Sequence, residues 1–68
     1  MFKVTYVIVA PEGEDPRSLV RPDEREILNA YQYYAAENGC IRENVFEKET
    51  NTAIVTYFWP DKASCPPL

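Results

Sequence analysis

Hydrophobic and polar residues alternate over residues 2–10, and every even-numbered residue of this segment is apolar. A period of two is typical of a β-strand with one face toward a core. Val7 and Val9 add apolar side chains to the other face, so both faces become apolar toward the end of the segment. Pro11 has no N–H to donate, and we expect the strand to end before it.

Residues 22–38 follow a helical period instead. Apolar and large side chains recur at intervals of three and four residues, which predicts an amphipathic helix with one stripe toward the core. The predicted stripe and its flanking residues are Ile27, Tyr31, Tyr34 and Asn38, with Leu28, Ala30 and Ala35.

The ends of this helix carry recognisable signals. Asp23, followed three residues later by Glu26, predicts a capping box at the first turn. Gly39 suits the left-handed conformation that closes a helix. On the face opposite the stripe, Tyr33 stands among polar residues, where it is either an amphipathic surface residue or a recognition residue.

Two more strands are predicted in the second half of the chain. Residues 45–50 form a short strand rich in charge, which is typical of a sheet edge. Residues 52–59 are apolar on both faces, as in a central strand, and Pro60 ends them. Thr50 and Asn51 lie at the hairpin tip, where Asn tolerates a positive φ.

This order of elements predicts a single α+β domain over residues 1–68. The hairpin places the third strand beside the second, and the first strand then pairs with the free edge of the third. The result is a three-stranded antiparallel sheet of order 1-3-2, with the helix packed on one face. Residues 11–21 form a long loop, and residues 60–68 an irregular C-terminal tail.

The composition of the chain argues against several classes of function. Eleven acidic residues outnumber seven basic ones for a net charge of −4, which argues against direct binding of a nucleic-acid backbone. No secretion signal or membrane span is evident, so the cytoplasm is expected, with Cys40 and Cys65 as reduced thiols. Without histidine, a metal site and general-base catalysis are both disfavoured. We therefore expect no enzyme and no cofactor.

The helix covers only one sheet face, yet apolar residues occupy both. An uncovered apolar face usually marks an interface. Val55, Tyr57 and Trp59 are grouped with Val7 and Val9 as the candidate self-interface of a homodimer. The alternatives are that the opposite set is exposed, or that the tail folds back over the face.

The carboxylates suggest a surface for a basic partner. Outer-face residues of the helix and acids of the long loop are predicted to form one negative surface with Tyr33 as its apolar anchor. The candidate partner-binding residues are Glu26, Asn29, Tyr33, Glu37, Glu12, Glu14 and Asp15.

No motif identifies a family. Small acidic α+β proteins are common among phage and mobile-element products that block a host machine, anti-CRISPR proteins among them. By this analogy we expect a non-catalytic inhibitor that binds another protein, with a nucleic-acid-binding host complex as one kind of target. The alternatives are a structural or regulatory homodimer and a small ligand-binding or enzyme accessory subunit.

Overall fold

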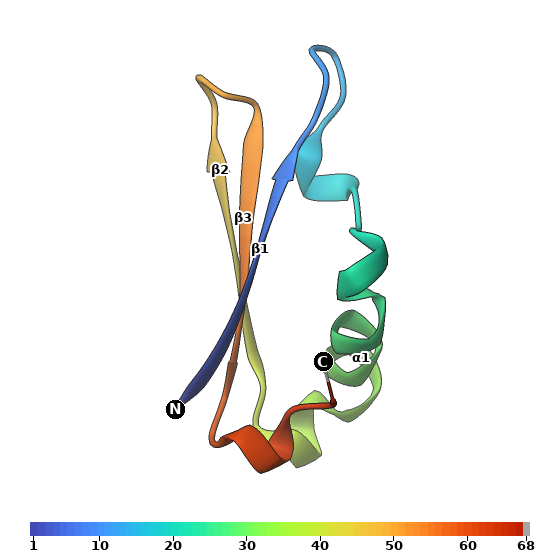
Figure 1. Cartoon of the computed structure of the whole chain (residues 1–68), viewed down its shortest axis with the longest axis vertical. Helices are drawn as coiled ribbons and strands as arrows, with labels where there is room; N and C mark the ends of the chain where they lie inside the picture. The colour runs from blue at the N-terminus through green and yellow to red at the C-terminus, as the bar shows by residue number, and fades with distance from the viewer. Residues whose placement is uncertain (68) are drawn as a thin grey trace.

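A computed structural model describes residues 1–67, except for the side chains of Ala35 and Ala36. Within that range it has three strands and one α-helix: β1 (Phe2–Val9), α1 (Arg25–Asn38), β2 (Ile41–Glu47) and β3 (Thr52–Trp59). The strands form an antiparallel sheet of order β1-β3-β2, and α1 lies on one side of it (Figure 1). The predicted α+β fold, strand order and helix position are confirmed.

The register decides which residues face α1. Tyr6 of β1 and Asn44 of β2 both lie opposite Val55 of β3. Even-numbered residues of the outer strands therefore share a face with odd-numbered residues of β3, because side chains alternate along each strand. This face packs under α1 and forms the core, whose buried members are Tyr6, Ile8, Ile27, Ala30, Cys40, Ala53, Val55, Tyr57 and Trp59.

The second strand differs from its predicted range. It begins at Ile41 instead of residue 45, and it ends at Glu47 before a turn that leads to Asn51. From the sequence, residues 40–44 are expected to form a turn between the helix and the sheet. In the fold, residues 41–44 belong to an edge strand, which tolerates polar side chains because neither of its faces is fully covered.

The start of the helix also differs. A 3₁₀ turn, η2 (Pro22–Glu24), precedes α1. Asp23 does not cap the helix; its carboxylate accepts two hydrogen bonds from the Arg21 guanidinium, at 2.9 and 3.2 Å. The partner of the capping box is Glu24, since its Oε1 accepts the backbone N–H of Arg21 at 3.3 Å. Glu26 instead lies exposed.

The predicted core stripe of α1 holds only in part. Ile27 and Ala30 are buried, and Leu28 and Tyr31 are half-buried against the core. Tyr34, however, is 55% exposed. Helical periodicity sets the direction in which a side chain leaves the helix, whereas its burial depends on how far the neighbouring elements extend.

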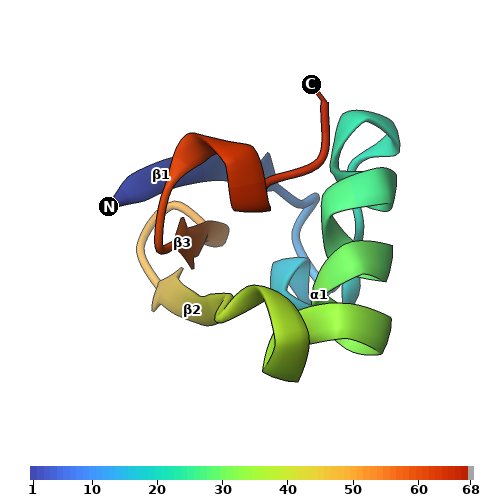
Figure 2. The same ribbon diagram turned by 90° about the horizontal axis from the view of Figure 1, so that it is seen from below.

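The long loop and the tail both contain ordered turns. The loop between β1 and α1 includes η1 (Pro16–Ser18), whose Pro16 is fully buried. The tail includes η3 (Lys62–Ser64), capped by Asp61, so the expected irregular tail has regular structure up to residue 64. Cys65 packs against the core. The backbone of the tail turns toward α1 after η3 (Figure 2). The tail therefore does not cover the other sheet face; Leu68 lies outside the described residues.

Candidate partner-binding surface

The outer face of α1 brings together the four helical residues that the sequence singled out. Glu26, Asn29, Tyr33 and Glu37 follow one another at intervals of three, four and four residues, and all four are exposed. Tyr33 is the most prominent, with 75% of its surface exposed. These four residues are called the α1 stripe below.

A second aromatic residue adjoins the α1 stripe. Tyr34 was predicted in the core but lies half-exposed next to Tyr33. The ion pairs within residues 1–67 are Arg17 with Asp15 and Arg21 with Asp23. Glu26 and Glu37 therefore present uncompensated charge on either side of two tyrosine rings.

The acids of the long loop do not extend this stripe. The segment 11–15, which contains Glu12 and Glu14, lies at one end of an elongated molecule that measures 37 × 19 × 19 Å, whereas α1 runs toward the other end (Figure 1). Asp15 is neutralised, because its two carboxylate oxygens accept hydrogen bonds from Arg17 at 2.9 and 3.0 Å. The single negative surface predicted from all seven residues is not formed, and only its helical part is contiguous.

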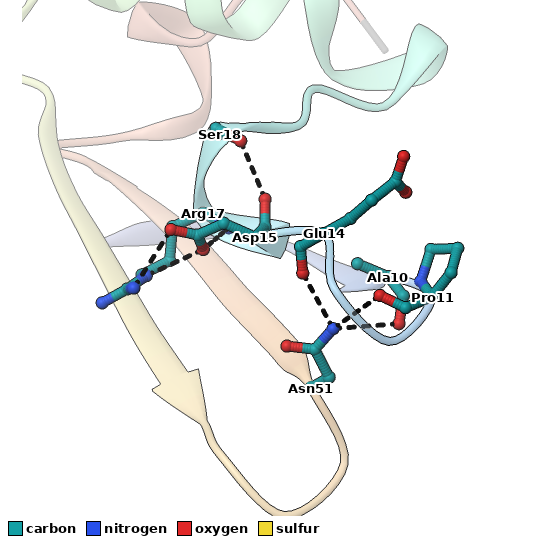
Figure 3. Close-up of polar contacts among 7 residues, drawn as sticks. All are labelled: Ala10, Pro11, Glu14, Asp15, Arg17, Ser18 and Asn51. Carbon is teal, nitrogen blue, oxygen red and sulfur yellow. Dashed lines mark hydrogen bonds and ion pairs between the residues drawn. The ribbon is translucent and has the colours of Figure 1, made fainter.

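The long loop is held in place by Asn51, the last residue of the turn before β3. Asn51 has a φ of 50°, and its side-chain amide donates to three carbonyl oxygens: those of Ala10 at 3.2 Å, Pro11 at 3.0 Å and Glu14 at 2.9 Å (Figure 3). The sequence identified Asn51 as a turn residue but not this second role. The contacts tie the loop to the β2–β3 hairpin.

Arg17 fastens the same loop to β2. Its guanidinium carbon lies 4.4 Å from the centre of the Phe46 ring, while its nitrogens bind Asp15. Asp15 also accepts the backbone N–H of Arg17 at 2.9 Å and thereby caps η1. Asp15 thus stabilises the conformation of the loop, and its charge, already paired with Arg17, is not free to attract a partner.

The predicted self-interface requires a correction. Val55, Tyr57 and Trp59 are each 0% exposed, because they face α1 and fill the core. Val7 does not share their face, since the register places it opposite Ile54. Neither predicted set is exposed as a whole. The uncovered face combines Val7 and Val9 with residues of the opposite set such as Ile54, and its exposed members include Val7, Val9, Ile41 and Val45.

A buried series of hydrogen-bonded side chains beneath α1 was not predicted from the sequence. Glu24 is 0% exposed, and its Oε2 accepts a hydrogen bond from the Tyr57 hydroxyl at 2.5 Å. The same hydroxyl accepts from Nε of Arg42 at 3.2 Å. One signal could have indicated it: Glu24 lies three residues before Ile27, on the same side of the helix.

Alkaline pH should destabilise the fold through its buried hydroxyls and thiols. Burial, followed by the hydrogen bond to Glu24, raises the pKa of Tyr57 above its ordinary value of 10.0. Burial likewise raises the pKa of Cys40 and Cys65 above 9.0 and that of Tyr6 above 10.0. These groups ionise more readily in the unfolded chain than in the folded one. The contribution of each neutral group to the stability of the fold is therefore complete below the pKa that the group has in the unfolded chain. It is lost as pH rises through the higher pKa of the folded state.

We therefore expect the free energy of unfolding to fall from about pH 9, with each group contributing about 1.4 kcal/mol per pH unit between its two pKa values. Urea unfolding between pH 7 and 11 measures this slope. In Tyr57→Phe the slope above pH 10 should be smaller. An equal slope in both proteins would contradict the assignment to Tyr57.

Two shallow depressions lie away from the α1 stripe. One, of about 400 Å³, lies between Phe2 and the tail around Cys65. The other, of about 570 Å³, lies between the loop after β1 and the β2–β3 turn, beside Phe46 and Asn51. In the described part of the chain, no three His, Cys, Asp or Glu residues come close enough to hold a metal ion. The α1 stripe remains the strongest candidate for a functional surface.

Comparison of the chain with protein-family models, with curated proteins and with solved structures finds no match. Over residues 1–67, no helix has the length and apolar character needed to cross a bilayer. The 14 residues of α1 fall short of the ~20 that such a helix needs.

Proposed function

We propose that this chain is a non-catalytic protein-binding module that blocks its partner through the outer face of α1. The observation that supports this most directly is the exposure of two adjacent tyrosines between carboxylates that form no ion pair within residues 1–67. Tyr33 and Tyr34 are 75% and 55% exposed, with Glu26 and Glu37 one to two helical turns away.

The chemistry of this face favours a protein target. A tyrosine ring offers a large contact area with few rotatable bonds, and tyrosines are enriched among the residues that dominate binding energy. Uncompensated carboxylates at the rim favour a basic partner surface and raise the rate of encounter. A nucleic-acid-binding protein presents such a basic surface, and Tyr33 would be the anchor within it.

For the biological setting, we propose an inhibitor of the kind encoded by phages and mobile elements, anti-CRISPR proteins among them, acting in the host cytoplasm. Its support is the small size and acidic charge of the chain, together with the fold. The free thiols of Cys40 and Cys65 fit a reducing compartment.

The test starts with a photo-crosslinking residue at Gln32, which is exposed on α1 beside the α1 stripe. A partner crosslinked from host extract is purified, and its affinity for unlabelled protein is measured. We expect Tyr33→Ala to weaken binding about tenfold or more, as for a central aromatic contact. Glu26→Lys with Glu37→Lys should weaken it further and reduce its dependence on salt.

Gln32→Ala is the matched control, since it truncates a neighbouring exposed side chain without touching the tyrosines or the acids. Its affinity should stay within about twofold of the original. Unchanged affinity in both Tyr33→Ala and the double charge reversal would reject the α1 stripe as the binding surface.

A further inference from the structure

The sheet face turned away from α1 carries no other element of the described chain (Figure 1). We call it the open face. Its twelve residues are Lys3, Thr5, Val7 and Val9 of β1, Thr52, Ile54, Thr56 and Phe58 of β3, and Ile41, Glu43, Val45 and Glu47 of β2. Among them, Val9 and Ile41 are 70% and 63% exposed.

Cross-strand pairing arranges the open face in rows. Val7, Ile54 and Val45 form an apolar row across the sheet, and Phe58 with Ile41 forms another. A contiguous apolar surface of this kind on a small protein usually becomes covered by a partner.

The charges of the open face are segregated by strand. Its only cation is Lys3, on β1, whose amino group lies 5.5 Å from the centre of the Phe58 ring on β3. Its two anions, Glu43 and Glu47, are both on β2 at the opposite edge. The open face thus has a positive edge, a neutral apolar centre and a negative edge.

We propose that the open face binds a second copy of this chain, face to face, about a two-fold axis parallel to β3. Such an axis places β1 of each copy over β2 of the other, and β3 over β3. Lys3 of one copy then lies over Ile41 of the second copy. Glu43 of that second copy lies one cross-strand row further along the sheet. The symmetry makes this contact twice, so the charge pattern complements itself.

The other aligned arrangement is unfavourable. A two-fold axis perpendicular to the strands would place β2 over β2, and the Glu43 and Glu47 carboxylates of both copies would gather along one edge of the interface, with Lys3 of both copies at the other edge. Opposed carboxylates at an interface that excludes water are repulsive. Aligned packing of two sheets therefore leaves the parallel axis as the favoured arrangement.

The size of the open face sets the strength of the dimer. Three strands about 4.8 Å apart and eight residues rising about 3.3 Å each give a projected area of roughly 380 Å² per copy. Stable interfaces bury about 800 Å² per partner. We therefore expect a weak dimer, with a dissociation constant on the order of 0.1 mM.

Sedimentation of the full chain between about 10 μM and 1 mM tests the proposal. Lys3→Glu and Glu43→Lys should each weaken self-association at least fivefold, because each creates two like-charge contacts. An equimolar mixture of the two variants should associate at least as tightly as the original chain, since both contacts are opposite in sign again.

Glu47→Lys is the matched control for Glu43→Lys. The two variants have the same net charge. In the proposed dimer, however, Glu47 lies over Val9 of the second copy and three cross-strand rows away from Lys3 of that copy. Its mixture with Lys3→Glu should associate more weakly than the mixture that contains Glu43→Lys. All three positions are exposed, so circular dichroism should show an unchanged fold.

Sedimentation would overturn the proposal if the chain were a monomer up to 1 mM, or if neither Lys3→Glu nor Glu43→Lys weakened the dimer. Rescue of Lys3→Glu by Glu47→Lys as effective as by Glu43→Lys would reject the arrangement as well. The proposed function is tested separately, because the α1 stripe lies on the other side of the molecule. Tyr33→Ala should leave self-association unchanged.

Discussion

Tyr57→Phe should lower the free energy of unfolding by about 2 to 3 kcal/mol, although it removes a single oxygen atom. The reason is the burial of Glu24, whose Oε2 accepts the Tyr57 hydroxyl while the residue is 0% exposed. Without that hydroxyl, a carboxylate oxygen stays in the core with no donor, and it cannot be hydrated without opening the fold.

The loss should be visible in a chain of 68 residues, because domains of this size have only a few kcal/mol of stability in reserve. A change of 1 kcal/mol shifts the thermal midpoint of such a domain by roughly 4 to 8 °C. Thermal and urea unfolding followed by circular dichroism would measure it.

Tyr31→Phe is the matched control for the loss of a hydroxyl. Tyr31 is half-buried and packs edge-on against Tyr57, with 6.0 Å between ring centres. No hydrogen bond of its hydroxyl occurs within the described residues, so Tyr31→Phe should cost less than about 0.5 kcal/mol. Equal losses in the two variants would show that the contact with Glu24 does not account for the effect.

A double-mutant cycle isolates the pair. Glu24→Gln keeps an acceptor of the same shape but removes the charge. If the two side chains act together, Tyr57→Phe with Glu24→Gln should lose at least about 0.5 kcal/mol less than the sum of the single losses. Strict additivity would mean that the two groups stabilise the fold independently.

Asn51→Ala should lower the free energy of unfolding by about 2 kcal/mol or more. Two losses combine at this position. Alanine is strained at a φ of 50°, and the three hydrogen bonds to the carbonyls of Ala10, Pro11 and Glu14 disappear. Because these bonds are partly exposed, water replaces some of them, which limits the cost.

Asn51→Gly separates the two contributions, since glycine adopts a positive φ without strain but makes none of the side-chain bonds. The free energy of unfolding of Asn51→Gly should lie between that of the original chain and that of Asn51→Ala. Asn51→Asp tolerates the backbone conformation but turns a carboxylate toward three carbonyl oxygens. We expect it to release the loop as fully as Asn51→Gly does.

The loop itself provides a local measurement. Cleavage by trypsin after Arg17 should become faster in all three Asn51 variants, because the contacts that hold residues 11–15 are gone. Unchanged cleavage and unchanged stability together would show that Asn51 acts only as a turn residue.

Much of the architecture follows from local patterns. Alternation and the bounding prolines define β1 and β3, and a strand that is apolar on both faces has to be central. The hairpin then leaves one free edge for β1, which is why the order 1-3-2 could be predicted. The period of α1 likewise predicts that Glu26, Asn29, Tyr33 and Glu37 share an exposed face.

Only the tertiary structure decides which face of the sheet is open. Alternation shows that Val55, Tyr57 and Trp59 point the same way, but not whether Val7 joins them. That depends on the register between β1 and β3, which are separated by more than forty residues of chain. A shift of one residue exchanges the two faces, so the buried and open sets could not be told apart from the pattern.

Tertiary packing also decides which charged residues are buried and which are paired with a residue of opposite charge. Glu24 is buried because Tyr57, 33 residues away in sequence, supplies the hydrogen bond that a buried carboxylate needs. Asp15 and Asp23 lose their free charge to neighbouring arginines, while Glu12 and Glu14 lie apart from α1. Sequence determines which groups carry charge, but distance and desolvation, which set the strength of a charge, arise only when the chain is folded.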